Sequence, residues 1–347
     1  MKKNSKRKRY KKAWWIFSFA VLLMVGAIFY LRNTVLKPFT PDTTVYIYID
    51  ERKDFEDIIH QLKEKANLPS EKIFSMLAKR MKYLSNIKTG CYAVKNGMTM
   101  MELIRILRAG MQTPVNVTFN NLRTKADLAS RLSQQLMVDS ISLMTALNDP
   151  QKVGELGFDT GTVVCMFIPN TYEVYWDIGV DKLLLRMKRE YDTFWSDERK
   201  AKAQKIGLTP VEVSILASIV EEEATYLDEY PIIAGLYLNR LRRGMKLEAD
   251  PTVKFAVGDF SLRRILFKHL EVDSPYNTYK YAGLPPGPIR IPSIEAIDAV
   301  LSPQQHSYLF MCAKEDLSGR HNFASTHTEH VRNALRYQRA LNERKIY

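Results

Sequence analysis

A basic tail followed by a long uncharged segment constrains the topology of this chain more than any other feature. Residues 1–12 carry eight Lys or Arg and no acid, and Ala13–Leu31 is a run of nineteen residues without a charge. As a helix, this run would span roughly 28 Å, which matches the ~30 Å hydrocarbon core of a bilayer. Because basic residues favour the cytoplasmic side, the chain beyond residue 32 is expected across the membrane. No small-x-small cleavage site follows the run, so a retained signal anchor is favoured over a cleaved signal peptide.

The remaining composition is that of an ordinary globular protein. The chain has 347 residues, of which 46% are hydrophobic and 26% charged, and this length suits two domains. The net charge is +13, and removing the eight charges of the tail leaves only about +5, so no nucleic-acid partner is expected. Cys91, Cys165 and Cys312 are too widely spaced for a disulfide framework or a metal knuckle.

Short strand and helix patterns predict an α+β fold. Apolar residues alternate over 45–49, a helical pattern follows over 55–62, and a further strand and helix end at Gly110. A similar strand and helix recur from Val115, and residues 181–205 have the pattern of one basic amphipathic helix. We therefore expect a cytoplasmic tail at 1–12, a transmembrane anchor at 13–31, a small membrane-proximal βα module at 32–112, and a larger mixed α+β domain at 113–347.

A helix with unusually clear start signals begins at Thr209. Thr209 is a candidate N-cap, Pro210 stands at the first helical position, and Glu212 completes a capping box. At 100° per residue, Glu223 falls on the apolar stripe formed by Leu216, Ile219, Val220 and Leu227. Glu221 and Glu222 point about 200° and 100° away from it. Only Glu223 is expected to be desolvated.

A carboxyl group in apolar surroundings has a different pKa from an exposed one. Burial disfavours the charged form and raises the pKa, which makes the group a proton donor near neutral pH. Glu223 is therefore a candidate general acid. The alternative is a structural carboxylate at a helix seam, satisfied by an arginine such as Arg240.

Two further regions bear on the substrate and on cofactors. Tyrosines interleave with Ser, Asn and Thr over 274–281, and Pro-rich residues stiffen the loop that follows, which is typical of a carbohydrate groove. His321, His327 and His330 lack the tight spacing of metal ligands, and there is no glycine-rich phosphate loop. We expect neither a metal nor a cofactor.

Several long motifs resemble one family in order and spacing. They are FIPNTYEVYW at 167–176, ASIVEEEA at 217–224, NRLRRGMKLEADPTV at 239–253, YNTYKYAGLPPGPI at 276–289 and HNFAS at 321–325. Together with the N-terminal anchor, they are similar to the YceG-like family of endolytic murein transglycosylases. The resemblance implies that Glu223 is the catalytic acid and that the membrane-proximal module is LysM-like. Ala224 and Glu248 stand where the family usually has Thr and Gln.

The resemblance also implies a set of substrate-binding residues within these motifs. They are Glu221, Asn239, Glu248, Asp250, Tyr276, Asn277, Thr278 and His321. The expected substrate is peptidoglycan, with peptidoglycan synthases as partners, membrane lipid around the anchor, and the catalytic domain on the extracytoplasmic side of a bacterial cytoplasmic membrane.

The implied reaction is cleavage of the bond between N-acetylmuramic acid and N-acetylglucosamine without water. Glu223 would protonate the glycosidic oxygen and then accept the proton of the muramic C6 hydroxyl, which leaves a 1,6-anhydro end. One alternative is a muramidase, which needs a second carboxylate such as Asp250 or Glu221. The other is a non-catalytic wall-binding or scaffold protein.

Overall fold

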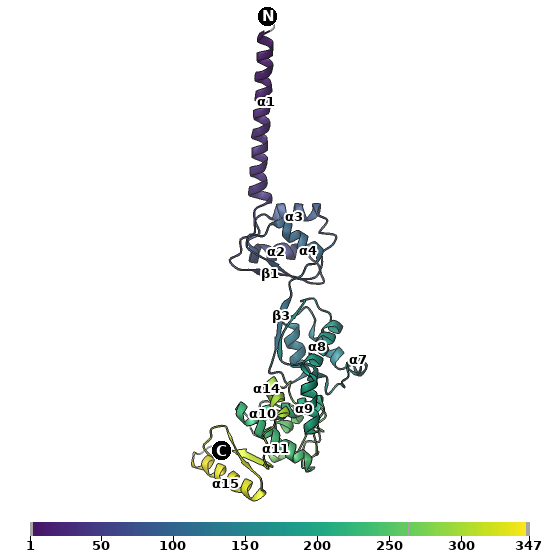
Figure 1. Cartoon of the computed structure of the whole chain (residues 1–347), viewed down its shortest axis with the longest axis vertical. Helices are drawn as coiled ribbons and strands as arrows, with labels where there is room; N and C mark the ends of the chain where they lie inside the picture. The colour runs from purple at the N-terminus through teal and green to yellow at the C-terminus, as the bar shows by residue number, and fades with distance from the viewer. Residues whose placement is uncertain (1–2, 263, 345–347) are drawn as a thin grey trace. The chain divides into compact units, whose positions relative to one another are not determined.

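The computed structural model describes residues 3–262 and 264–344, and the chain forms two compact units. The first comprises Met1–Asn116 with Glu173–Asp177, and the second comprises Val117–Tyr172 with Ile178–Tyr347. Helices and short strands are mixed along the chain, as Figure 1 shows and as the α+β prediction requires.

The N-terminal segment is one long helix. Helix α1 covers Lys3–Tyr30 and is followed by a π-helical turn, η1, at Leu31–Val35. The stretch Trp14–Val35 is long and apolar enough to cross a membrane by length and composition. Its large side chains between Trp14 and Tyr30 are exposed.

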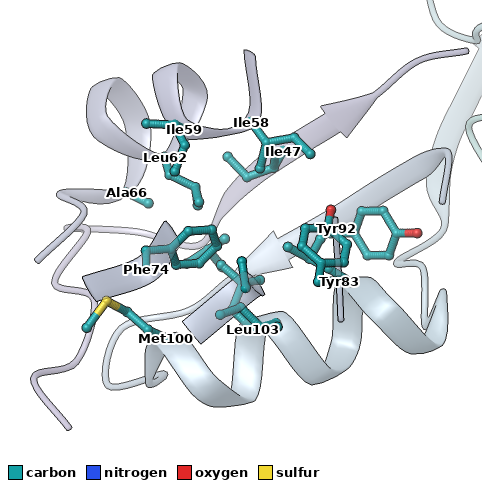
Figure 2. Close-up of a cluster of buried hydrophobic side chains, with 14 of the residues drawn as sticks. Ile47, Ile58, Ile59, Leu62, Ala66, Phe74, Tyr83, Tyr92, Met100 and Leu103 are labelled. Atoms are coloured by element: carbon teal, nitrogen blue, oxygen red, sulfur yellow. The ribbon is translucent and has the colours of Figure 1, made fainter. Parts of the chain in front are cut away.

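The first unit continues with strand β1 (Val45–Ile49), helices α2 (Phe55–Ala66) and α3 (Glu71–Arg80), strand β2 (Gly90–Val94) and helix α4 (Met100–Ala109). Strands β1 and β2 pair antiparallel, with Ile47 opposite Tyr92. The alternation of β1 turns Ile47 and Ile49 into a core that also contains Leu62 and Phe74 (Figure 2). The predicted strand at 45–49 and the predicted helix end at Gly110 are confirmed.

Strands β3 (Val115–Phe119) and β4 (Asn170–Val174) form a two-stranded sheet. Between these strands lie α5 (Lys125–Ser133), α6 (Ser140–Leu147), α7 (Pro150–Glu155) and the 3-10 turn η2 (Val163–Met166). The single helix expected over 181–205 is wrong. The chain forms α8 (Val180–Phe194) and α9 (Asp197–Ile206), because Trp195 is buried at the break and Ser196 caps α9 through the N–H of Arg199.

Helix α10 (Pro210–Glu223) is central to the second unit. It begins with the predicted capping box of Thr209 and Glu212 and packs against α9, α11 (Tyr230–Arg242), α12 (Asp250–Val257) and α14 (Ile294–Leu301). The predicted single apolar stripe is wrong, because every residue from Val213 to Val220 is buried. Ser218 is accommodated since its hydroxyl donates to the Ile215 carbonyl at 2.7 Å and accepts from the Ile289 N–H at 3.0 Å.

The C-terminal part completes the second unit. The 3-10 turn η3 (Leu227–Glu229) joins α10 to α11, and α13 (Phe267–Leu270) precedes the proline-rich loop. Strands β5 (Phe310–Ala313) and β6 (His321–Ala324) form an antiparallel hairpin that packs against α15 (His327–Glu343). Thr326 caps α15, since its side chain accepts from the N–H of Glu329.

Candidate active site

Glu223 is the last residue of α10, where the backbone turns extended at Ala224. Its carboxylate accepts a hydrogen bond from the hydroxyl of Tyr237, with an Oη–Oε1 distance of 2.7 Å. Tyr237 lies on the packed face of α11 and is 1% exposed. The two packed helices therefore fix the position of this carboxyl group.

Glu223 lines a cavity of about 480 Å³. The walls come from the ends of α10 and α11, the segment before α12, the hairpin of β5 and β6, and the start of α15. The polar lining side chains are Glu223, Tyr237, Arg240, Glu248, Asp250, Tyr279, Cys312, His321, His327 and His330. A cavity of this size, with several convergent polar groups, is typical of a small-ligand site.

The surroundings of Glu223 favour its protonated form. The pKa of the Glu223 carboxyl is raised to about 7, mainly by burial, with the Tyr237 hydrogen bond opposing the rise and the nearby charges of Asp250 and Glu222 adding to it. The side chain still has partial access to the cavity. A carboxyl with this pKa holds its proton in much of the population near neutral pH and can donate it there.

The three acids of the EEE run have three environments, as the helical phase predicts. Glu221 accepts from the Ser293 N–H at 2.6 Å and lies 3.1 Å from an Arg290 nitrogen. Glu222 pairs with Arg290 at 2.7 Å and with Arg123 at 2.6 Å. Neither lines the cavity that contains Glu223.

The expectation that only Glu223 is desolvated is wrong. Burial also raises the pKa of the Glu221 carboxyl, and only 13% of the Glu222 side chain is exposed. The reason is that α10 is enclosed on all sides. What sets Glu223 apart is its partner: within the described residues it has a tyrosine hydroxyl, whereas Glu221 and Glu222 have arginines.

Arg240 is not the partner of Glu223. Its guanidinium donates to the carbonyl oxygens of Leu309 and Leu247, each at 2.7 Å, and of Lys246 at 3.0 Å. It also lies 3.0 Å from Glu248. Arg240 therefore joins the hairpin to the segment before α12, so that two walls of the cavity are tied together.

The cavity contains three of the eight residues expected to bind substrate, namely Glu248, Asp250 and His321. Asp250 accepts from the Tyr279 hydroxyl at 2.7 Å. Burial and this hydrogen bond both raise the pKa of Tyr279, so its phenol remains a donor at neutral pH.

The other five residues make contacts within the fold. Glu221 pairs with Arg290, as described, and the Asn239 side chain donates to the carbonyl oxygens of His306 and Tyr308. Asn277 and Thr278 are fully buried, and the Thr278 hydroxyl accepts from the Ala249 N–H at 3.0 Å. The Tyr276 ring packs on Phe255, with ring centroids 4.7 Å apart. Of these, Asn239 and Thr278 hold segments that lie next to cavity residues in the chain.

Sequence reasoning missed Tyr237 and Tyr279 as cavity residues. Tyr237 follows Glu223 by fourteen residues on a separate helix, so no helical period relates the two. Tyr279 was visible only as one aromatic in a tyrosine-rich loop. Among the described residues, no group of three or more His, Cys, Asp or Glu side chains has the arrangement of a metal site.

Comparison with known proteins gives a consistent match over most of the chain. The chain is 28% identical over 340 residues to an endolytic murein transglycosylase of Bacillus subtilis, covering 93% of each protein. It is 25% identical to one of Streptococcus pneumoniae over 92% of this chain and 64% of that protein. A crystal structure of a yceG-like protein from Listeria monocytogenes has a TM-score of 0.56 and 26% identity, covering 84% of this chain and 99% of the other. The model of the YceG-like family matches residues 47–336, and the chain therefore belongs to the YceG-like family.

Proposed function

We propose that this protein is an endolytic peptidoglycan lytic transglycosylase with Glu223 as its catalytic acid. The observation that carries the proposal is a carboxyl group with a pKa near 7 that lines a polar cavity and has no cationic partner within the described residues. The names of the relatives from Bacillus and Streptococcus support the reaction class.

In the proposed reaction, a muramic acid residue of the glycan strand occupies the cavity. Glu223 donates its proton to the glycosidic oxygen as the C1–O bond breaks. The C6 oxygen then bonds to C1, and its proton passes to the carboxylate that has just formed. The products are a 1,6-anhydro-muramic end and a new N-acetylglucosamine C4 hydroxyl, and cleavage of nascent strands in this way would terminate their elongation. No water is consumed.

Four other side chains of the cavity would support this chemistry. Tyr237 holds one carboxyl oxygen through its hydroxyl, which leaves the second oxygen for the substrate. The Tyr279–Asp250 pair and Glu248 supply hydrogen-bonding groups for sugar hydroxyls on the same cavity. Glu248 lies beside Arg240, so its carboxylate would accept rather than donate.

The products distinguish this proposal from its alternatives. We expect the full-length protein in detergent, mixed with purified glycan strands, to yield shorter strands whose new muramic ends are lighter by one water than reducing ends. Reducing ends, detected by the same mass spectrometry, would instead indicate a muramidase that uses Asp250 as a second carboxylate. Intact strands would support a wall-binding or scaffold role.

We also propose that the N-terminal helix is a signal anchor in the bacterial cytoplasmic membrane and that the 32–112 segment is a LysM-like, peptidoglycan-associated module. The order β1, α2, α3, β2, with the two strands antiparallel, supports the module assignment. Peptidoglycan synthases are the partners that this placement implies. The catalytic domain, residues 113–347, would then lie outside the cytoplasm.

Protease protection tests this topology. Protease added to spheroplasts should digest the chain beyond the anchor and leave only a short N-terminal fragment, because the basic tail remains in the cytoplasm. Immunoblotting with antibodies to the tail and to the Glu223 region reports both ends. Protection of the Glu223 region in intact spheroplasts would contradict the proposed orientation.

A further inference from the structure

A carboxylate outside the cavity holds one of the cavity histidines in a fixed orientation. His321, at the start of β6, donates its backbone N–H to Glu229 Oε1 at 2.9 Å, and its ring Nδ1 lies 3.0 Å from Glu229 Oε2. Only 14% of the His321 side chain and 5% of the Glu229 side chain are exposed. Glu229 directly precedes α11, where its side chain makes no capping hydrogen bond, and it is not part of the cavity lining.

The contact with Glu229 determines which ring nitrogen of His321 can accept a hydrogen bond or a proton. An ionised carboxylate can only accept hydrogen bonds, so Nδ1 must carry a proton. In the neutral imidazole, Nε2 is then an acceptor. No hydrogen bond to Nε2 is found among the described residues, and His321 lines the same cavity as Glu223.

The other two cavity histidines are held differently. His327 and His330 lie against the ring of Phe310, with centroid distances of 5.8 and 5.4 Å. Neither forms an ion pair with a carboxylate in the part of the chain that the structure describes. His321 is thus distinguished by a partner that sets its tautomer.

We propose that His321, oriented by Glu229, is the base that accepts the C6 hydroxyl proton in the proposed reaction. This inference rests on the transglycosylase function proposed above and divides between two residues the proton transfers assigned there to Glu223. Glu223 gives its proton to the leaving oxygen, the C1–O bond breaks, the C6 oxygen bonds to C1, and the C6 hydroxyl proton moves to His321 Nε2. Glu223 ends as a carboxylate and His321 as an imidazolium. Transfer of that proton back to Glu223, directly or through solvent, restores both groups.

The Glu229→Gln variant tests the orientation without touching the cavity. The backbone N–H of His321 requires an oxygen acceptor, so the amide oxygen should face it and the amide NH₂ should face Nδ1. Nδ1 then becomes the acceptor and Nε2 carries the proton, which blocks its action as a base. We expect a loss of anhydro-product formation of about 10²- to 10⁴-fold, as reported for general base catalysis and for the wrong tautomer in an Asp–His pair. Asp228→Asn, which alters the neighbouring exposed acid paired with Arg320, should leave the rate unchanged.

His321→Asn tests the base itself. Asparagine can keep the donor to Glu229 but has no counterpart of Nε2, so folding should be retained and the rate should fall by roughly 10²- to 10⁴-fold. The low-pH limb of kcat/KM that reports protonation of the base should disappear. The matched control is His327→Asn, a histidine of the same cavity without a carboxylate partner. In His321→Ala, added imidazole should restore part of the activity.

Other titratable groups face the same cavity and can also contribute to the pH dependence of kcat/KM. They are Glu223, Glu248, Asp250, Cys312, His327 and His330, with Arg240 as the fixed positive charge. His327→Asn and His321→Asn each remove one histidine of the cavity. If the low-pH limb of kcat/KM disappears in His321→Asn but not in His327→Asn, that limb belongs to His321.

The outcomes separate this inference from the proposed function. If His321→Asn forms anhydro ends at close to the wild-type rate with an unchanged pH profile, the inference is overturned and Glu223 performs both transfers. If His321→Asn does not fold, the rate and pH profile of Glu229→Gln decide in the same way. Absence of anhydro ends from the wild-type protein would instead refute the proposed function.

Discussion

Glu223→Gln is expected to lower the formation of 1,6-anhydro ends by at least ~10²- to 10⁴-fold, the range attributed to general acid–base catalysis. Glutamine keeps the shape and can still accept the hydrogen bond from Tyr237, but it has no proton to donate at neutral pH. The measurement is the initial rate of anhydro-product formation on purified strands, with thermal unfolding as a check of the fold.

The adjacent acids supply matched controls. Glu221→Gln and Glu222→Gln remove charges that pair with Arg290 and do not line the cavity. These variants should lose some stability, because buried Arg290 loses one of its two carboxylate partners, while each folded molecule retains activity. Near-normal turnover in Glu223→Gln, together with an inactive Glu221→Gln, would show that the catalytic carboxyl belongs to Glu221 and not to Glu223.

Glu223→Gln should also change how the free energy of unfolding depends on pH. The Glu223 pKa is about 7 in the folded protein and 4.5 ordinarily, so between these values the folded state binds more protons than the unfolded state. Stability from this group is therefore full below about pH 4.5 and falls as pH rises towards 7, by about 3 kcal/mol. Urea unfolding of both proteins at several pH values should show Glu223→Gln gaining on the wild type as pH rises. A constant difference would contradict the raised pKa.

Features specified by neighbouring residues could be predicted from the sequence. The start of α10 was predictable because Thr209, Pro210 and Glu212 act within one turn, and β1 because its alternation is local. Glu223 could be selected because helical phase separates it from Glu221 and Glu222. The environment that sets its pKa, including burial by α11 and the hydroxyl of Tyr237, comes from a different helix and is not encoded in that phase.

Features that depend on long-range partners were predicted incorrectly or not at all. Ser218 looks like a solvent-facing residue, yet its hydroxyl binds the N–H of Ile289, seventy-one residues away, which allows α10 to be buried all round. The break at Trp195 arises because its large ring is buried in the fold, whereas the flanking sequence has the pattern of a continuous helix. The pairing of His321 with Glu229 spans ninety-two residues and leaves no local pattern.

The largest effect on stability is expected from Arg240. Only 5% of Arg240 is exposed, and its guanidinium satisfies the carbonyl oxygens of Lys246, Leu247 and Leu309. Arg240→Met keeps much of the volume of the side chain but leaves these acceptors without a donor, and each buried unsatisfied group costs about 1–3 kcal/mol. We expect the free energy of unfolding to fall by about 3–5 kcal/mol, because three carbonyl acceptors lose their donor at once. Denaturant titration measures this difference.

Two further variants show whether the loss of stability comes from the unsatisfied carbonyl oxygens or from the broken ion pair with Glu248. The Glu248 side chain is 47% exposed, so Glu248→Gln should cost no more than about 1 kcal/mol, as for other exposed pairs. Arg240→Lys keeps the charge, but one ammonium group cannot reach three carbonyls in the directions that a planar guanidinium serves, so its stability should lie between those of the other two variants. If Arg240→Lys matches the wild type while Glu248→Gln is as unstable as Arg240→Met, charge pairing rather than carbonyl satisfaction holds these walls of the cavity together.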